Sequence, residues 1–193
     1  DRIKEGEVFY NSTDFKLKSF VATDAWHSTG GLTNGRASLS AAGTVPAGMV
    51  FGGAGVSNKT EEYNGSGFSA GGNMNTARQA LGGAGTQTAC LGFGGYSTTL
   101  LALTEEYDGS SWSESGDLAT ARQYVAGAGT QTAGLAFAGK AAPAKTNSTE
   151  EYNGTSWTAG GNMNTARAYL AGCGIQTSAL AFGGSSTATT GIT

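Results

Sequence analysis

A segment of about twenty residues recurs along this chain, and this repetition constrains the fold more than any other feature of the sequence. Three copies begin at Thr76, Thr120 and Thr165, and a more divergent copy spans 34–53. Each of the three contains a Thr-Ala-Arg triplet, a stretch of Ala, Leu and Gly, a Gln-Thr turn and an apolar stretch ending near a Phe. Such regularity is typical of arrays in which each repeat is one structural unit that packs against its neighbours.

The repeated residues are separated by three fixed intervals and one variable interval. An aromatic residue precedes an arginine by ten positions, and this arginine precedes a phenylalanine by fifteen. These positions are Trp26, Phe68, Trp112 and Trp157, then Arg36, Arg78, Arg122 and Arg167, then Phe51, Phe93, Phe137 and Phe182. A tyrosine (Tyr63, Tyr107, Tyr152) lies five positions before the next aromatic residue, and only the Phe–Tyr interval changes, from twelve to fifteen. The pattern predicts a rigid unit with one variable loop.

Each repeat is predicted to contain four short β-strands, because no segment shows the period of an amphipathic helix. The strand through Leu91 and Phe93 alternates strictly between two faces, and the Asn-Gly and Asp-Gly pairs predict tight hairpins. The strand at 80–85 consists almost entirely of small residues, as strands crowded around an axis require. These features predict an all-β propeller with its aromatic residues between adjacent sheets.

The spacing divides the chain into an N-terminal β segment, 1–25, and four predicted blades, 26–65, 66–109, 110–154 and 155–193. The N-terminal segment resembles the Tyr–Trp half of a repeat. Because a ring of sheets has to cover its two end sheets, we expect 1–25 to supply the outer strands of the last blade. The alternative is that the chain is a piece of a longer array, in which 1–25 links to an upstream part.

Composition argues against several classes of protein. Gly accounts for 33 of the 193 residues and Pro for 2, and the glycines are periodic, which is not expected of a disordered chain. Charged residues make up 13% and the net charge is -3, so we expect no nucleic-acid partner. No run approaches the roughly 18 apolar residues of a membrane helix, so we expect no membrane insertion.

The segment Phe93-Gly-Gly95, followed by Glu106-Tyr107-Asp108, Trp112 and Thr120-Ala-Arg122, resembles the kelch repeat. The resemblance covers 26–193 and departs from the kelch pattern at Ala138, which replaces the first glycine of the pair, at Phe68, and throughout the first repeat. It implies a kelch-like β-propeller of about four blades, each with four antiparallel strands.

The recurrent Thr-Glu-Glu-Tyr-Asn-Gly and Asn-Thr-Ala-Arg motifs are similar to kelch-like arrays in tail and fibre proteins of marine bacterial viruses. This second resemblance implies localisation in the virion; otherwise the protein is expected outside the cell or in the cytoplasm. It is the only source for the viral context.

Several residues are candidates for chemistry, each with a structural alternative. The four arginines would place guanidinium groups near one mouth of a propeller, suited to an acidic peptide or a sugar carboxylate. The favoured alternative is that each pairs with a carboxylate or carbonyls of a neighbouring strand. Only one glutamate of each Glu-Glu pair can face a given site, since neighbours on a strand point to opposite faces.

Few other residues suggest a reaction. His27 is the only histidine, so we expect no histidine-rich metal centre, no Ser-His-Asp triad and no cofactor. Cys90 and Cys173 are interpreted as free thiols that fill tight positions.

The variable loops 54–59, 96–103, 140–148 and 185–192 are expected to emerge together on one face and to carry the contact surface. Tyr96, Lys140 and Lys145 are its candidate binding residues, beside the four arginines. We therefore expect a non-catalytic structural or adhesion module whose partners are other structural proteins or a host-surface receptor or glycan; self-association into a homo-oligomer is a further option. A cellular kelch scaffold for protein–protein contacts and a glycan-processing propeller enzyme are the two alternatives.

Overall fold

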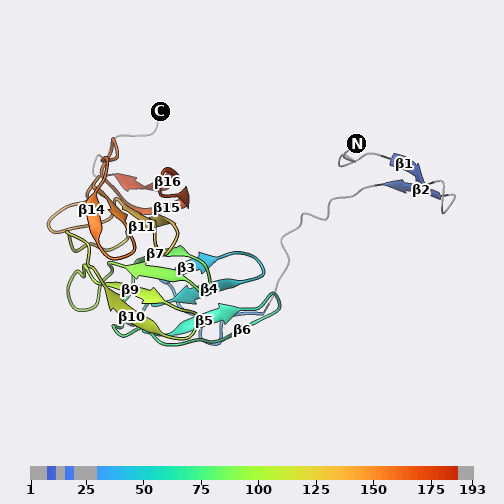
Figure 1. Cartoon of the computed structure of the whole chain (residues 1–193), viewed down its shortest axis with the longest axis horizontal. Helices are drawn as coiled ribbons and strands as arrows, with labels where there is room; N and C mark the ends of the chain where they lie inside the picture. The colour runs from blue at the N-terminus through green and yellow to red at the C-terminus, as the bar shows by residue number, and fades with distance from the viewer. Residues whose placement is uncertain (1–7, 12–15, 20–29, 187–193) are drawn as a thin grey trace.

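The computed structural model describes residues 8–11, 16–19 and 30–186, and these residues form strands and turns without any helix (Figure 1). The described part of the chain therefore contains no helix with the length and apolar character needed to cross a membrane. Two N-terminal strands, β1 (Val8–Asn11) and β2 (Lys16–Ser19), pair with each other. The repeats then form four consecutive antiparallel sheets, which we call units 1 to 4.

Units 1 to 3 are four-stranded sheets, and unit 4 is a pair of longer strands. Unit 1 contains β3 (Ser40–Gly43), β4 (Gly48–Phe51), β5 (Thr60–Tyr63) and β6 (Phe68–Ala70); unit 2 contains β7 (Gly82–Gly85), β8 (Cys90–Phe93), β9 (Thr104–Tyr107) and β10 (Trp112–Ser115); unit 3 contains β11 (Ala126–Gly129), β12 (Gly134–Phe137), β13 (Thr149–Tyr152) and β14 (Trp157–Ala159); unit 4 contains β15 (Arg167–Ile175) and β16 (Ser178–Ser186). Each strand pairs with the next one along the chain, so every sheet is a meander.

The last hairpin of each four-stranded sheet is closed by an Asn-Gly or Asp-Gly turn. In unit 2 the Asp108 carboxylate accepts hydrogen bonds from the N–H groups of Ser110 and Ser111, each at 2.8 Å, and Gly109 has a φ of 94°. This turn pairs Trp112 with Tyr107 across the hairpin. The aromatic strand therefore belongs to the same sheet as the tyrosine before it, and the sheets are offset by one strand from the predicted divisions at 66–109 and 110–154.

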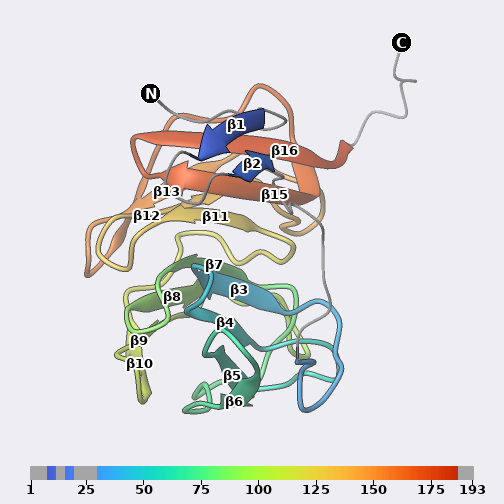
Figure 2. The ribbon, with the colours of Figure 1, turned by 90° about the vertical axis from the view of Figure 1, so that its right-hand side faces the viewer.

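The first strands of the four units lie side by side, with β7 between β3 and β11, and β11 between β7 and β15 (Figure 2). Together they line a pocket of about 260 Å³, to which the segments 39–41, 81–83, 125–127 and 170–172 contribute. Small residues are required here, because a Cβ atom on Gly127 would lie 2.3 Å from the carbonyl oxygen of Gly83. This arrangement of repeated antiparallel sheets around common inner strands is consistent with a β-propeller.

Backbone hydrogen bonds join the inner strands from one unit to the next. The N–H of Ala80 donates to the carbonyl of Ser38 at 2.8 Å, that of Tyr124 to Ala80 at 2.7 Å, and that of Tyr169 to Tyr124 at 3.4 Å. All four residues have a positive φ, between 53° and 63°, although none is glycine. The same backbone geometry therefore recurs at the entry of every inner strand. Within 30–186, no such bond joins unit 4 back to unit 1.

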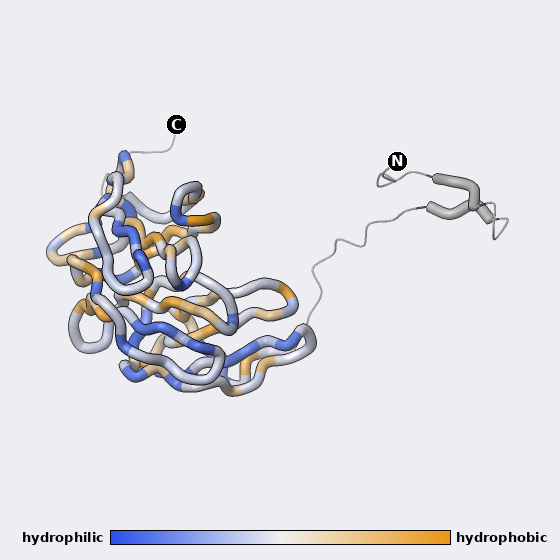
Figure 3. Tube along the Cα trace, viewed as in Figure 1, coloured by the Kyte–Doolittle hydropathy of each residue, from blue (hydrophilic) through white to orange (hydrophobic). Residues whose placement is uncertain are grey.

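Aromatic side chains fill the interfaces between units. The Phe51 ring of unit 1 lies 4.9 Å from the Trp112 ring of unit 2, and Phe93 lies at the same distance from Trp157 of unit 3. The Trp112 indole N–H also donates to the Thr60 hydroxyl at 3.0 Å. The strands at the centre are the more hydrophobic ones, and β9 and β10 at the periphery carry hydrophilic stretches (Figure 3).

Unit 4 has no third or fourth strand among the described residues. The sheet of β15 and β16 contains neither β1 nor β2, which instead satisfy each other's backbone groups as a hairpin with Val8 opposite Ser19. The segment 1–25 was expected to supply outer strands to the last blade, but β1 and β2 do not join the sheet of unit 4. Trp26 and His27 lie outside the described residues.

The Trp112 contacts predict a large effect on stability. Trp112→Ala should lower the free energy of unfolding by roughly 3–5 kcal/mol, because it empties a packed interface between two units. Trp112→Phe keeps a ring beside Phe51 but loses the bond to Thr60, so it should cost clearly less. Ser97→Ala in a loop is the control and should be nearly silent. Urea denaturation measures all three, and a Trp112→Ala protein as stable as wild type would contradict the interface.

Candidate functional site

In units 1 to 3, the arginine that precedes the inner strand forms an ion pair with a glutamate of the same unit. The Nη1 of Arg36 lies 2.7 Å from the Glu61 carboxylate, the Nη2 of Arg78 lies 3.1 Å from Glu105, and the corresponding pair of unit 3, described below, has the same geometry. Arg78 and Glu105 are 0% and 1% exposed, so neither side chain presents its charge to solvent. In unit 3, Arg122 and Glu150 are 2.8 Å apart.

Each of these carboxylates also holds the segment that leads into the inner strand. Glu105 accepts hydrogen bonds from the N–H groups of Asn75 at 2.7 Å and Thr76 at 3.2 Å. The N–H of Thr33 donates to Glu61, and that of Ala119 to Glu150, both at 2.7 Å. The ion pair therefore fixes the connection between successive units as well as neutralising a buried charge.

The pKa values follow from this environment. Burial lowers the pKa of Arg78 to about 10, opposed by the charges of Glu105 and Asp117, so the guanidinium stays protonated at neutral pH. Burial acts in the same direction on Arg122. Burial would raise the pKa of Glu61, but hydrogen bonds from Thr33 and the charge of Arg36 outweigh it and lower the pKa. Three of the four arginines are thus paired with a carboxylate of a neighbouring strand, the structural alternative to ligand binding.

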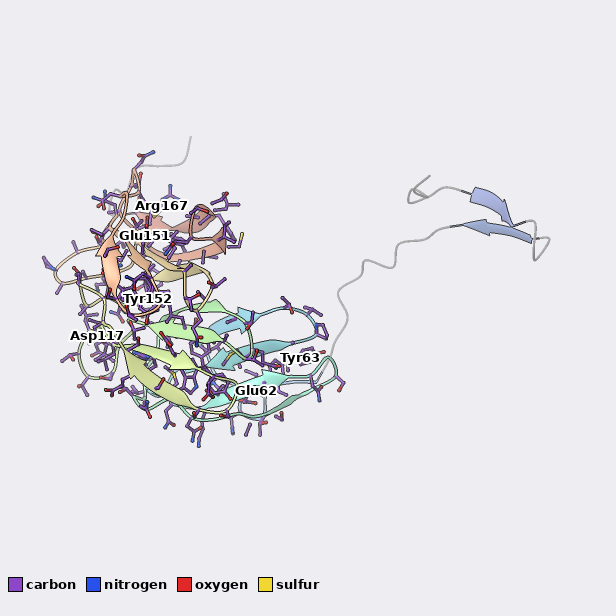
Figure 4. The ribbon with its side chains drawn as sticks, in the orientation of Figure 1. Glu62, Tyr63, Asp117, Glu151, Tyr152 and Arg167 are labelled. Carbon is purple, nitrogen blue, oxygen red and sulfur yellow. The ribbon has the colours of Figure 1, made fainter. Side chains whose placement is uncertain are left out.

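Arg167 is the exception. It begins the inner strand of unit 4 and is half-buried, and its Nη1 donates to the carbonyl of Gly183 at 3.0 Å. Within the described residues, no carboxylate lies within ion-pair distance of it. Figure 4 shows Arg167 in the same part of the molecule as Glu151, apart from Glu62 and Tyr63 of unit 1.

In units 1 and 2, the second glutamate of the pair accepts a hydrogen bond from the following unit. The hydroxyl of Tyr107 donates to the Glu62 carboxylate of unit 1 at 2.5 Å, and the hydroxyl of Tyr152 donates to Glu106 of unit 2 at the same distance. Burial, together with the hydrogen bond to the carboxylate, raises the pKa of both tyrosines to about 12. Glu151, the corresponding residue of unit 3, is exposed.

Sequence reasoning missed the glutamine of each Gln-Thr turn. Gln87, Gln131 and Gln176 each donate through Nε2 to two backbone carbonyls of the preceding unit; Gln131, for example, bonds to Cys90 at 3.1 Å and to Tyr107 at 2.8 Å. Each glutamine lies nine positions after the repeated arginine, and this constant spacing was a usable signal.

The three described variable loops differ in length, and those of units 2 and 3 start in the same way. Tyr96 exchanges two backbone hydrogen bonds with Gln79, at 2.8 and 2.9 Å, and Lys140 does the same with Gln123, at 2.7 and 3.0 Å. Lys140 is exposed, while Tyr96 is half-buried. Lys145 is hydrogen-bonded within the molecule, because its Nζ donates to Ser185 and to the carbonyl of Ser186 in unit 4.

The arginine side chains bond to the carbonyls that end these loops, Lys59, Leu103 and Ser148. The arginines and the loops thus occupy the same end of the units.

The cysteines are both free, Cys90 buried and Cys173 exposed, and burial raises the pKa of the Cys90 thiol. No group of three or more His, Cys, Asp or Glu side chains in the described part of the chain is arranged to hold a metal ion.

No protein-family model matches the sequence, and no curated protein matches it.

The ion pairs predict that equivalent arginines contribute differently to the free energy of unfolding. Arg78→Gln should cost roughly 3–5 kcal/mol, because it leaves the buried Glu105 carboxylate unpaired. Arg167→Gln removes the same group where none of the described carboxylates is paired with it, and should change stability by less than about 1 kcal/mol. Urea denaturation of the two variants measures the difference, and equal costs would contradict the assigned roles.

The tyrosine–glutamate bonds predict a loss of stability at alkaline pH. The pKa of Tyr107 rises from 10.0 to about 12 on folding, so its protonated hydroxyl stabilises the fold below pH 10. That contribution is lost as the pH rises from about 10 to about 12. Tyr107→Phe should therefore be less stable than wild type at pH 8, and the gap should narrow across that window in urea titrations. Tyr96→Phe is the control, and a gap that stays constant to pH 12 would refute the assignment.

Proposed function

We propose that this chain is a non-catalytic structural and adhesion module of the kelch-like β-propeller type, carried by a viral particle or tail appendage. In this proposal its partner is a host-surface receptor or glycan, or another structural protein of the particle. The kelch-like and viral parts rest on the resemblance of the repeated motifs.

One observation carries the adhesion part of the proposal. The loops that follow β4, β8 and β12 start from the same backbone position, and this position carries Ala54, Tyr96 and Lys140 in the three units. The arginine, tyrosine and glutamine contacts that hold units 1 to 3 together recur, whereas these side chains differ. A constant frame that presents different side chains at equivalent places is the usual design of a recognition surface.

The use of the charged residues supports the non-catalytic part. An active site needs one constellation, but the acidic pairs occur once in each of units 1 to 3. The first glutamate of each pair binds an arginine of its own unit, and Glu62 and Glu106 bind a tyrosine of the next. Their positions are thus explained by folding.

Cell binding tests the adhesion proposal. A double variant, Tyr96→Ala with Lys140→Ala, should bind intact marine bacterial cells at least tenfold more weakly than wild type, as measured by flow cytometry with labelled protein. Its melting temperature should stay within a degree or two, because both are loop side chains. The matched control is Thr86→Ala with Thr88→Ala, exposed residues in the turn at the other end of β8. Equal binding by both double variants, or no binding to any strain, would contradict the proposal.

A further inference from the structure

The loops of units 2 and 3 each form a short ladder with the entry segment of the inner strand. The central residue of each ladder is bridged in antiparallel fashion to one residue on either side of it. Residues bridged in this way project their side chains to the same face, with Cβ atoms about 4.5–5.5 Å apart. Each loop therefore presents a row of three side chains. The rows are Gln79, Tyr96 and Leu100 in unit 2, and Gln123, Lys140 and Lys145 in unit 3.

The two rows are neighbours, because the entry segment of unit 3 lies against the loop of unit 2. The N–H of Gly95 donates to the carbonyl of Arg122 at 2.8 Å. Gly95 directly precedes Tyr96, and Arg122 directly precedes Gln123. The row of unit 2 thus meets the row of unit 3 at this hydrogen bond. We call the surface formed at this place by Tyr96, Gln123, Lys140 and Lys145 the junction patch.

The two lysines of the junction patch lie side by side without a carboxylate between them. Like charges opposite each other on neighbouring strands are destabilising, and the same places in unit 2 carry Tyr96 and Leu100, so the frame does not require lysine there. Neither lysine forms an ion pair with any described residue, since Glu105 and Glu150 at this end are already bound to arginines. The fold therefore leaves two positive charges together that it does not use.

The row of unit 3 also has hydrogen-bond donors to spare. The Nζ of Lys145 donates to the hydroxyl of Ser185 at 2.7 Å and to the carbonyl of Ser186 at 2.9 Å. An ammonium group has three N–H donors, so these bonds hold the Lys145 side chain in place and leave one N–H for a ligand. Lys140 is exposed, and within 30–186 neither its Nζ nor the Gln123 amide forms a hydrogen bond. The row can thus donate to an anion and to a neighbouring oxygen at once.

We propose that the junction patch binds an acidic oligosaccharide, whose sugar rings carry carboxylate or sulfate groups. The anionic group of one sugar lies between Lys140 and Lys145, and the Gln123 amide donates to an adjacent hydroxyl. The C–H face of the next sugar packs on the Tyr96 ring, because the face of an aromatic ring carries partial negative charge. This inference rests on the proposed adhesion function and names the class of ligand that its loop surface takes.

The backbone of the two ladders favours a sugar over an acidic peptide as the ligand. An extended peptide gains much of its affinity from main-chain hydrogen bonds to a free strand edge. Tyr96 and Lys140 are each bridged on both sides, so neither offers such an edge. Recognition at the junction patch depends on side chains, and the hydroxyl and acidic groups of a sugar match ammonium and amide donors without main-chain pairing.

Three trisaccharides test the site on the whole chain by ligand-observed NMR: trigalacturonate, sulfated galactotriose and neutral galactotriose. At least one charged probe should bind about fivefold more tightly than the neutral one, as expected of exposed ion pairs, and added salt should reduce this preference. Lys140→Gln should remove most of the preference and leave binding of the neutral probe unchanged. Tyr96→Ala should instead weaken charged and neutral probes alike. Lys59→Gln, an equal change of charge at an exposed residue of unit 1, is the control and should keep the preference.

The inference is overturned if no charged probe binds at about 10 mM, if all three probes bind equally, or if Lys59→Gln reduces the preference as much as Lys140→Gln does. A Gly-Glu-Gly-Glu peptide that binds as tightly as the best sugar would also overturn it, in favour of an acidic peptide. Its failure is distinct from failure of the adhesion proposal. Loop-dependent binding to cells without binding of any sugar probe would refute only the ligand class, whereas binding of a charged sugar without binding to cells would refute only adhesion.

Discussion

The structure depends on one constraint: a sheet of four-residue strands cannot bury its own aromatic side chains. The next unit covers the Phe51 ring, with Trp112 lying against it, and Trp157 lies against Phe93 in the same way. Large aromatic surfaces of this kind provide most of the favourable energy of packing. Close approach of the units is possible because the inner strands carry glycine and alanine, so that backbone passes within reach of backbone. Each unit is therefore stable only as a member of the array.

Buried charges set the geometry that this packing requires. Removing Arg78 and Glu105 from water is costly, and mutual attraction alone seldom compensates for it. Here the carboxylate also accepts two backbone N–H groups from the segment that enters the inner strand, and the guanidinium donates to the carbonyls of Leu103 and Gly92. Nearly all the polar groups of the pair are thereby satisfied, although the Nε of Arg78 finds no acceptor among the described residues. We infer that the Arg78–Glu105 ion pair fixes the path of the chain into the inner strand.

The contacts between units recur along the chain, whereas the loop side chains vary. The repeated glutamine, tyrosine and arginine contacts maintain the frame, so the side chains of the loops after β4, β8 and β12 can differ between units at little cost. The same regularity shows how unit 4 differs from units 1 to 3 among the described residues. Within the described residues, Arg167 has no ion-pair partner and Glu151 accepts no tyrosine hydroxyl, unlike their counterparts in the preceding units. Phe182 is 48% exposed, whereas Phe51, Phe93 and Phe137 are buried.

Much of the architecture was predictable from the sequence, because periodicity is a local property. Strict alternation around Leu91 and Phe93 predicted a strand, Asp108-Gly109 predicted a hairpin, and the constant spacing of arginine and aromatic residues predicted a repeated all-β unit. The sequence also indicated that only one glutamate of each pair could face a given partner. Which one it was depended on strand register and on the neighbouring unit, so only the tertiary structure assigned Glu105 to Arg78 and Glu106 to Tyr152. The same holds for the pairing of β1 with β2 and for the open edge of β16, since a strand's partner is decided by distant backbone groups that compete for the same hydrogen bonds.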